Sequence, residues 1–117
     1  MKFFRFDKEV GFPIKQYDSQ AAQFIKVLRG KQETSVGFIQ VDAGGVVGYH
    51  QASVQQLFIV VQGDGWVTGT DRERISIKSG EGVMWEKGEW HESGSDSGML
   101  ALVVESETID CSLLQEK

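Results

Sequence analysis

Apolar and polar residues alternate over short distances along this chain, and the period of an amphipathic helix is weak. Short segments rich in β-branched and aromatic residues follow one another closely, separated by glycine-rich turn signals at 63–65, 69–71, 78–80 and 93–98. The pattern predicts strands at Phe3–Phe6, Gln23–Leu28, Ser35–Val41, Gln56–Gln62, Gly65–Thr68, Arg74–Lys78, Gly82–Trp85 and Met99–Val104. Strands at this spacing are typical of an antiparallel sandwich or barrel, so we expect an all-β fold.

Two of these segments, Leu57–Val61 and Met99–Val104, are apolar at every position. A strand with one solvated face should alternate, so both faces of these two should be covered. One face would line a barrel, and the other would pack on a second sheet or another subunit. The segment Arg74–Lys78 does alternate, which predicts that Ile75 and Ile77 face inward.

Composition narrows the class of protein. A length of 117 residues fits one domain spanning 1–117. Twelve basic against 17 acidic residues give a net charge of −5, which argues against a nucleic-acid or anionic-membrane partner and leaves small molecules or other protein chains. The lone Cys111 allows no intrachain disulfide, and the charged N-terminus lacks a signal-peptide apolar run, so we expect a cytoplasmic protein. The segment Thr108–Lys117 fits either a short helix or a frayed strand.

Two histidines, His50 and His91, carry most of the chemical information, because they are the only histidines and each lies in a glycine-spaced β segment. Two facing strands could hold them close together inside one barrel. If the chain from residue 50 onward stays extended, His50 and Gln56 share a face that continues to Phe58. We therefore predict a ligand pocket, part polar and part apolar. Its residues are His50, Gln56, Phe58, Trp90 and His91, with Trp90 at the rim.

The spacing of the first histidine segment, about 44–63, resembles the first signature motif of the cupin family. That motif reads Gly, five residues, His-x-His, three or four residues, Glu, six residues, Gly. Gly44, His50 and Gly63 stand at its places, while Ala52 replaces the second His and Gln56 replaces the Glu.

The second segment, about 80–95, is similar to the second cupin motif: Gly, five residues, Pro-x-Gly, two residues, His, three residues, Asn. Gly80, Gly88 and His91 match, while Glu86 replaces the Pro and Ser95 replaces the Asn. The resemblance covers nearly the whole domain and implies an all-β cupin-type jelly-roll β-barrel.

In metal-binding cupins, the two His and the Glu of the first motif and the His of the second motif hold the ion. The resemblance therefore implies His50, Gln56 and His91 as candidate ligands for one divalent ion, with Zn, Fe, Mn and Ni as the alternatives. Catalytic zinc normally takes three protein ligands, and non-haem iron oxygenases use two His and a carboxylate, so the carboxylate is the missing part. Glu92 should point to the face opposite His91, and the direction of Glu89 stays open.

Three functions follow from this site. The first is a non-catalytic or regulatory protein that binds a small organic ligand in its barrel. The second is a metal-dependent enzyme of the dioxygenase or isomerase type that uses His50 and His91. The third is a metal-free isomerase with a histidine as general base. A further alternative is that the two histidines bond each other, a water or Gln56 and have no such role.

Other features are expected to be structural. The sequence at Gly63–Gly65 is expected to form a hairpin turn rather than a phosphate loop. Cys111 has no nearby histidine in sequence and is not expected to be a catalytic thiol. Glu105, like Asp42, Glu73 and Glu81, is expected to be solvated or hydrogen-bonded in a turn. The doubly apolar strands predict a homodimer, because a lone barrel would expose part of their surface.

Overall fold

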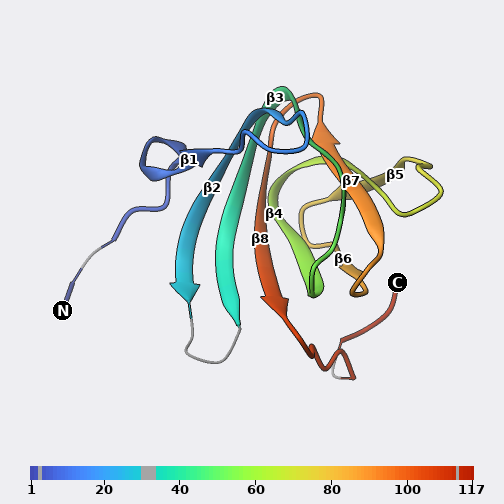
Figure 1. The fold of residues 1–117 in the computed structure, drawn as a ribbon. Helices are drawn as coiled ribbons and strands as arrows, with labels where there is room; N and C mark the ends of the chain where they lie inside the picture. Colours follow the sequence, from blue (N-terminus) through green and yellow to red (C-terminus); the bar gives the residue numbers. More distant parts are fainter. Residues whose placement is uncertain (3, 30–33, 113) are drawn as a thin grey trace.

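The computed structural model describes residues 1–2, 4–29, 34–112 and 114–117. Apart from one short 3₁₀ helix, the regular structure in these ranges is β-strand (Figure 1). The elements are η1 (Lys8–Val10), β1 (Phe12–Pro13), β2 (Gln20–Arg29), β3 (Ser35–Gln51), β4 (Gln55–Thr68), β5 (Ile75–Lys78), β6 (Gly82–Trp85), β7 (Trp90–Ser95) and β8 (Met99–Ser106). The described residues contain no helix long and apolar enough to span a membrane.

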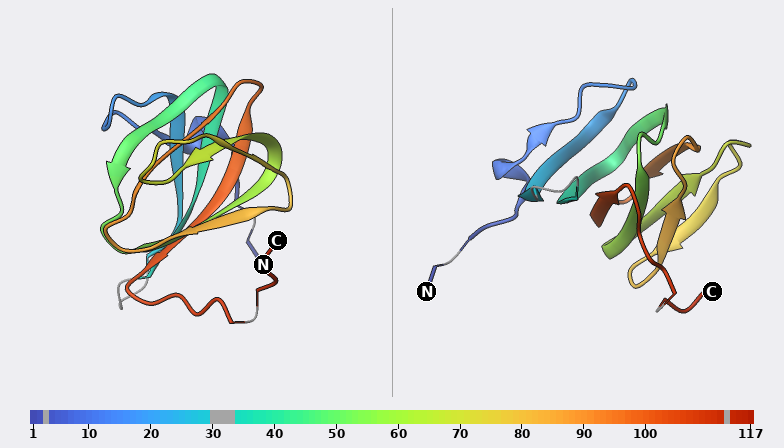
Figure 2. Two further views of the ribbon diagram at one scale, coloured as in Figure 1. Left: turned by 90° about the vertical axis from the view of Figure 1, so that its right-hand side faces the viewer. Right: turned by 60° about the horizontal axis from the view of Figure 1, so that its bottom comes forward.

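The two longest strands, β3 and β4, close the barrel because each takes part in both of its sides. The first part of β3 pairs with β8, and its last part pairs with β7. The first part of β4 pairs with β6 and β8, and its last part pairs with β5 and β7. All these ladders are antiparallel, and Figure 2 shows the resulting closed barrel. The predicted all-β jelly-roll barrel is confirmed.

The expected hairpin at Gly63–Gly65 is wrong, because these residues lie inside β4. Gly63 has a φ of +82°, a left-handed conformation that glycine adopts without steric cost. The bend falls where the ladder to β8 ends, at Gly63, and the ladder to β5 begins, at Asp64. Glycine therefore turns one continuous strand from one side of the barrel to the other instead of reversing the chain.

Other local predictions also fail. The predicted turn at 93–98 overlaps β7, which was not among the predicted strands. Ile77 is buried as expected, but Ile75 is 64% exposed, because β5 lies at the end of the strand order. Within the described residues, 4–6 form no strand, and 108–112 and 114–117 form neither helix nor strand; residues 3 and 113 lie outside the described ranges.

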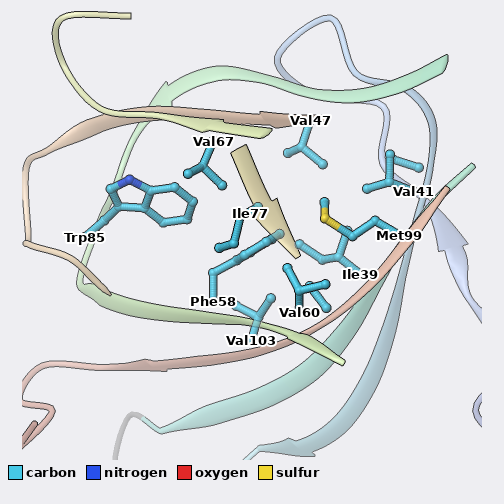
Figure 3. Packing of buried hydrophobic residues seen from close by; sticks show 12 residues of the cluster. Ile39, Val41, Val47, Phe58, Val60, Val67, Ile77, Trp85, Met99 and Val103 are labelled. Carbon is cyan, nitrogen blue, oxygen red and sulfur yellow. The ribbon is translucent and has the colours of Figure 1, made fainter. Parts of the chain in front are cut away.

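A continuous apolar core fills the barrel between its two sides (Figure 3). Phe58, Val60, Ala101 and Val103 supply its centre from β4 and β8, and each is at most 2% exposed. Burying a side chain of this kind stabilises the fold by about 1.5–3 kcal/mol for the larger residues. Trp85 lies at one end of the labelled cluster in Figure 3, and His91 stacks on its ring.

Candidate functional site

The histidine pair is assembled by the ladder between β3 and β7, in which His50 stands directly opposite His91. The register shifts between Val47 and His50, so β3 contains one extra residue there. This bulge lets both Val47 and His50 point into the barrel although their spacing is odd. The two imidazole centroids lie 4.3 Å apart with their planes tilted by 56°.

Backbone carbonyls orient both rings. The Nδ1 atom of His50 lies 2.7 Å from the oxygen of Gly48, and that of His91 lies 3.3 Å from the oxygen of Glu89. A carbonyl can only accept, so we assign the proton of each neutral ring to Nδ1. Each Nε2 then carries a lone pair and can accept a hydrogen bond or bind a cation.

His91 is the buried member of the pair, with 3% of its surface exposed. Its Nε2 is buried and has no hydrogen-bond partner among the described residues. Burial lowers the pKa of His91 to about 4, repulsion from a protonated His50 adds to this, and the bond to the Glu89 carbonyl opposes it. At neutral pH, His91 is therefore an uncharged base whose acceptor atom is unused.

Aromatic rings extend the pair in both directions. Tyr17 stacks on His50 with a centroid distance of 4.0 Å and an angle of 8°. On the other side, Trp85 stacks on His91 at 4.2 Å and 23°, and Phe58 lies 5.6 Å beyond Trp85. The indole of Trp85 is fixed because its Nε1 donates to the carbonyl of Thr68 at 3.1 Å. The result is a row of contacting rings that is stacked at Tyr17–His50 and at Trp85–His91 and tilted between the two histidines.

Gln56 enters the site from the opposite side of the barrel, because residues 52–54 break the extended chain and connect β3 to β4. Gln56 is 8% exposed and stands opposite both Trp85 on β6 and Glu105 on β8. Its amide forms no hydrogen bond with a described residue. The expectation that the chain from 50 to 56 stays extended is thus wrong, although both ends reach the same end of the barrel.

Glu105 corrects a sequence-based expectation, because it lies in β8 and not in a solvated turn. It alternates in phase with Ala101 and Val103, which are at most 2% exposed, so its side chain is on the inner face of the barrel. Desolvation raises the pKa of Glu105, and a protonated His50 opposes that rise. Extending the predicted strand 99–104 by two residues would have revealed this carboxylate.

The two carboxylates closest in sequence to His91 turn away from it. Glu92 forms an ion pair with Arg72 at 3.8 Å on the outer face, as strand alternation predicted. Glu89 accepts a hydrogen bond from the backbone N–H of Glu86 at 3.0 Å and so closes the turn before β7. Glu105 is therefore the carboxylate whose charge couples to the pair.

Two predicted pocket residues have other surroundings. Trp90 is 41% exposed, and its ring stacks on Tyr49 at a centroid distance of 5.3 Å, on the face of β7 opposite His91. Phe58 is 1% exposed and belongs to the core below Trp85. The structure thus brings together His50, His91 and, across the barrel, Gln56, but places Trp90 outside the barrel.

The donor set fits a metal ion only in part. The unpaired Nε2 of His91 and the lone pair of His50 are suitable imidazole donors. Gln56 offers a neutral amide in place of a carboxylate, and the buried Ala52 offers no donor atom. Among the described residues, no three His, Cys, Asp or Glu side chains gather in a way that could hold an ion. The residues therefore do not complete a three-ligand centre.

Comparison with known proteins identifies the fold. The sequence matches no family model and no curated protein. Solved structures with similar folds include the polyketide cyclase RemF from Streptomyces resistomycificus, with a TM-score of 0.74 and 16% identity over 92% of this chain and 81% of that one. A cupin-2 domain from Rhodospirillum rubrum has a TM-score of 0.71 and 13% identity, covering 86% and 69%. A cupin-like protein from Thermotoga maritima has 0.69 and 16%, covering 74% and 69%.

Proposed function

We propose that this chain, a barrel of the cupin fold, binds a small organic ligand at its polar end, around His50 and His91, without converting it. The observation that carries the proposal is the buried Nε2 of His91, which lacks a hydrogen-bond partner in the described part of the chain. A buried acceptor left unpaired costs about 1–3 kcal/mol. A ligand that donates a hydrogen bond to this atom would recover much of that cost.

The surroundings support binding because they combine fixed flat surfaces with polar groups. The ring of Trp85 is held by its hydrogen bond to Thr68, and Gln56 faces it across the ladder with an amide that can donate and accept. Ligand sites commonly join apolar walls with a few placed polar groups in this way. The unpaired Cys111 also fits our proposal of a cytoplasmic protein.

The test replaces His91 by Phe, which keeps a flat ring against Trp85 and removes the acceptor. Thermal shift with a panel of small hydroxylated, amine and carboxylic compounds should find compounds that stabilise the parent protein and lose most of that effect in the variant. Product analysis of the stabilising compounds should show no turnover. Equal stabilisation of the His91→Phe variant would mean that the compounds bind elsewhere. Turnover of a stabilising compound would refute the non-catalytic part of the proposal and show that the protein is an enzyme.

A metal-dependent enzyme is the second candidate, because two imidazoles from paired strands lie with their ring centroids 4.3 Å apart and each carries a lone pair on Nε2. Bound metal would act as a Lewis acid on the ligand. Untagged protein, purified without chelators or nickel resin, would then contain about one equivalent of a single metal. The His50→Ala, His91→Ala double variant would contain none. Equal metal content in both proteins would refute this candidate.

A metal-free isomerase is supported less by the site. With its pKa lowered to about 4, His91 is a weak base at neutral pH, so proton abstraction would depend on His50. Activity that disappears in a His50→Gln variant and rises with pH between about 5 and 8 would support this candidate. A flat profile across that range would count against it.

A further inference from the structure

Glu105 is a partly buried carboxylate that the proposed function does not yet use. It stands opposite Gln56 on one side and opposite Ser35 on the other, so the three form a polar row across β4, β8 and β3. The next inward row contains Phe58 and Val103, which are at most 2% exposed. The polar row is therefore the rim of the apolar core at the end where the histidines lie.

No partner neutralises this carboxylate within the described ranges, since the side chain of Glu105 forms neither a hydrogen bond nor an ion pair there. Desolvation raises the pKa of Glu105, and the charge of a protonated His50 opposes that rise, so His50 is the group to which the carboxylate couples. At the same end of the barrel, the buried Nε2 of His91 has no hydrogen-bond partner among the described residues and can accept one. The site thus presents hydrogen-bond acceptors from two sides and a negative charge in a poorly hydrated position.

We infer that Glu105 is a specificity-determining residue that favours hydroxylated ring compounds and excludes anions. This inference rests on the proposed function, because it assumes that the ligand lies beside His91. Hydroxyl groups supply the donors that the Nε2 of His91 and the carboxylate require. The faces of Trp85 and His91 already pack on each other, so a ligand ring would contact the edges of these rings, an arrangement that aromatic pairs also favour. An anionic ligand would meet an unpaired negative charge in a medium that screens it poorly.

Three single-ring probes separate these requirements. Catechol has two hydroxyl donors, 1,2-dimethoxybenzene has the same substitution without donors, and benzoate carries a negative charge. Binding is measured by calorimetry and located by the ¹⁵N shift of His91 Nε2. In the parent protein, catechol should bind about tenfold or more tightly than either of the other probes.

The Glu105→Gln variant removes the charge and keeps the shape. Its preference for catechol over benzoate should fall about tenfold, through weaker catechol binding and stronger benzoate binding. Glu105→Asp keeps the charge and should retain the preference. The matched control is Glu107→Gln, which removes the same charge from an exposed position where Glu107 pairs with Lys87. It should leave the preference unchanged.

The outcomes distinguish this inference from the proposed function. If catechol shifts His91 Nε2 and Glu105→Gln leaves the catechol-to-benzoate ratio unchanged, the role of Glu105 is refuted while binding at the histidines stands. If none of the three probes shifts that atom, the ring-compound class is refuted. The proposed function is judged separately, by the broader panel and the His91→Phe variant.

Discussion

At the scale of single residues, the protonation state of His91 follows from its place on β7. Its ring is enclosed by Trp85 and His50, and burial favours the neutral form. Its Nδ1 points at a backbone carbonyl, so its Nε2 must accept. His91 thus combines a strongly lowered pKa with an Nε2 atom that is free to accept a hydrogen bond. Residues with a strongly shifted pKa are found often at functional sites.

The lowered pKa of His91 predicts that the protein loses stability on mild acidification. Below about pH 6.5, the unfolded chain protonates this histidine, whereas the folded chain does not until about pH 4. The free energy of unfolding should therefore fall between these values, by roughly 3 kcal/mol from this group. The raised pKa of Glu105 acts in the opposite direction as the pH falls, because the folded state then holds the proton more tightly.

Urea unfolding at several pH values between 7 and 4 checks this expectation. The His91→Phe variant should lose most of the slope between pH 6.5 and 4, while other carboxylates titrate equally in both proteins. Parallel pH profiles of the parent and the variant would show that His91 is not the source of the acid sensitivity.

At the scale of elements, glycines allow two segments to approach more closely than any side chain would permit. The carbonyl of Tyr17 lies against the α-carbon of Gly48 where a Cβ would be, and the hydroxyl of Ser19 accepts from the Gly48 N–H at 3.1 Å. This close approach presses the segment before β2 onto β3 and sets the ring of Tyr17 against His50. The spacing of the motifs therefore could not predict that Tyr17 lies beside the site.

A Gly48→Ala substitution should displace that segment, because its Cβ would meet backbone atoms that have no flexible end. We expect a loss of about 1–3 kcal/mol in the free energy of unfolding, and loss of the contact between Tyr17 and His50 in NMR. Gly69→Ala is the control, because its Cβ would meet only the end of the Glu89 side chain, at 3.2 Å. Equal stability of the two variants would refute the role of Gly48.

The bend in β4 gives a second matched pair. Gly63 and Gly80 have φ values of +82° and +90°, so alanine at either position should cost about 1–2 kcal/mol. A Cβ at Gly63 would also meet the carbonyl oxygen of Gly98, whereas a Cβ at Gly80 has no neighbour within 4 Å. Gly63→Ala should therefore lose about 1–3 kcal/mol more than Gly80→Ala in denaturant unfolding. A smaller loss at Gly63 would contradict the close crossing.

At the scale of the whole molecule, β4 and β8 divide their apolar residues between two faces. Their inner residues form the core, while Leu57, Ile59, Leu102 and Val104 face outward and are only partly buried in the single chain. Phe38 on β3 stands opposite Leu102 and continues this surface. We keep the sequence-based proposal that a second copy of the chain covers it.

Sedimentation velocity at micromolar concentration tests the homodimer. The parent protein should sediment as a dimer, and Leu102→Glu should give a monomer. Ile75→Glu is the control, because Ile75 is 64% exposed on β5, away from this surface, and the variant should remain dimeric. A parent protein that sediments as a monomer would refute the proposal.

The sequence by itself determined the fold class and the positions of several strands. The closely spaced turn signals predict short strands, and the two fully apolar segments predict strands that are covered on both faces, as in a small all-β barrel. The spacing of glycines and histidines resembles the cupin motifs and so indicated the jelly-roll type of barrel. The glycine-spaced segments also indicated that two facing strands could hold His50 and His91 close together, although neither residue fell in a predicted strand. Local patterns suffice for these features since they depend on residues close together in the chain.

Only the tertiary structure decided which groups meet the histidines. Glu105 and Tyr17 come from segments far from His91 in sequence, and the ladder register and the crossing at Gly48 bring them to the site. Tertiary packing also turned 63–65 from a hairpin into a bend and Trp90 away from the barrel. The physical reason is that register and bulges are set by packing across strands, which the order of residues along one strand does not record.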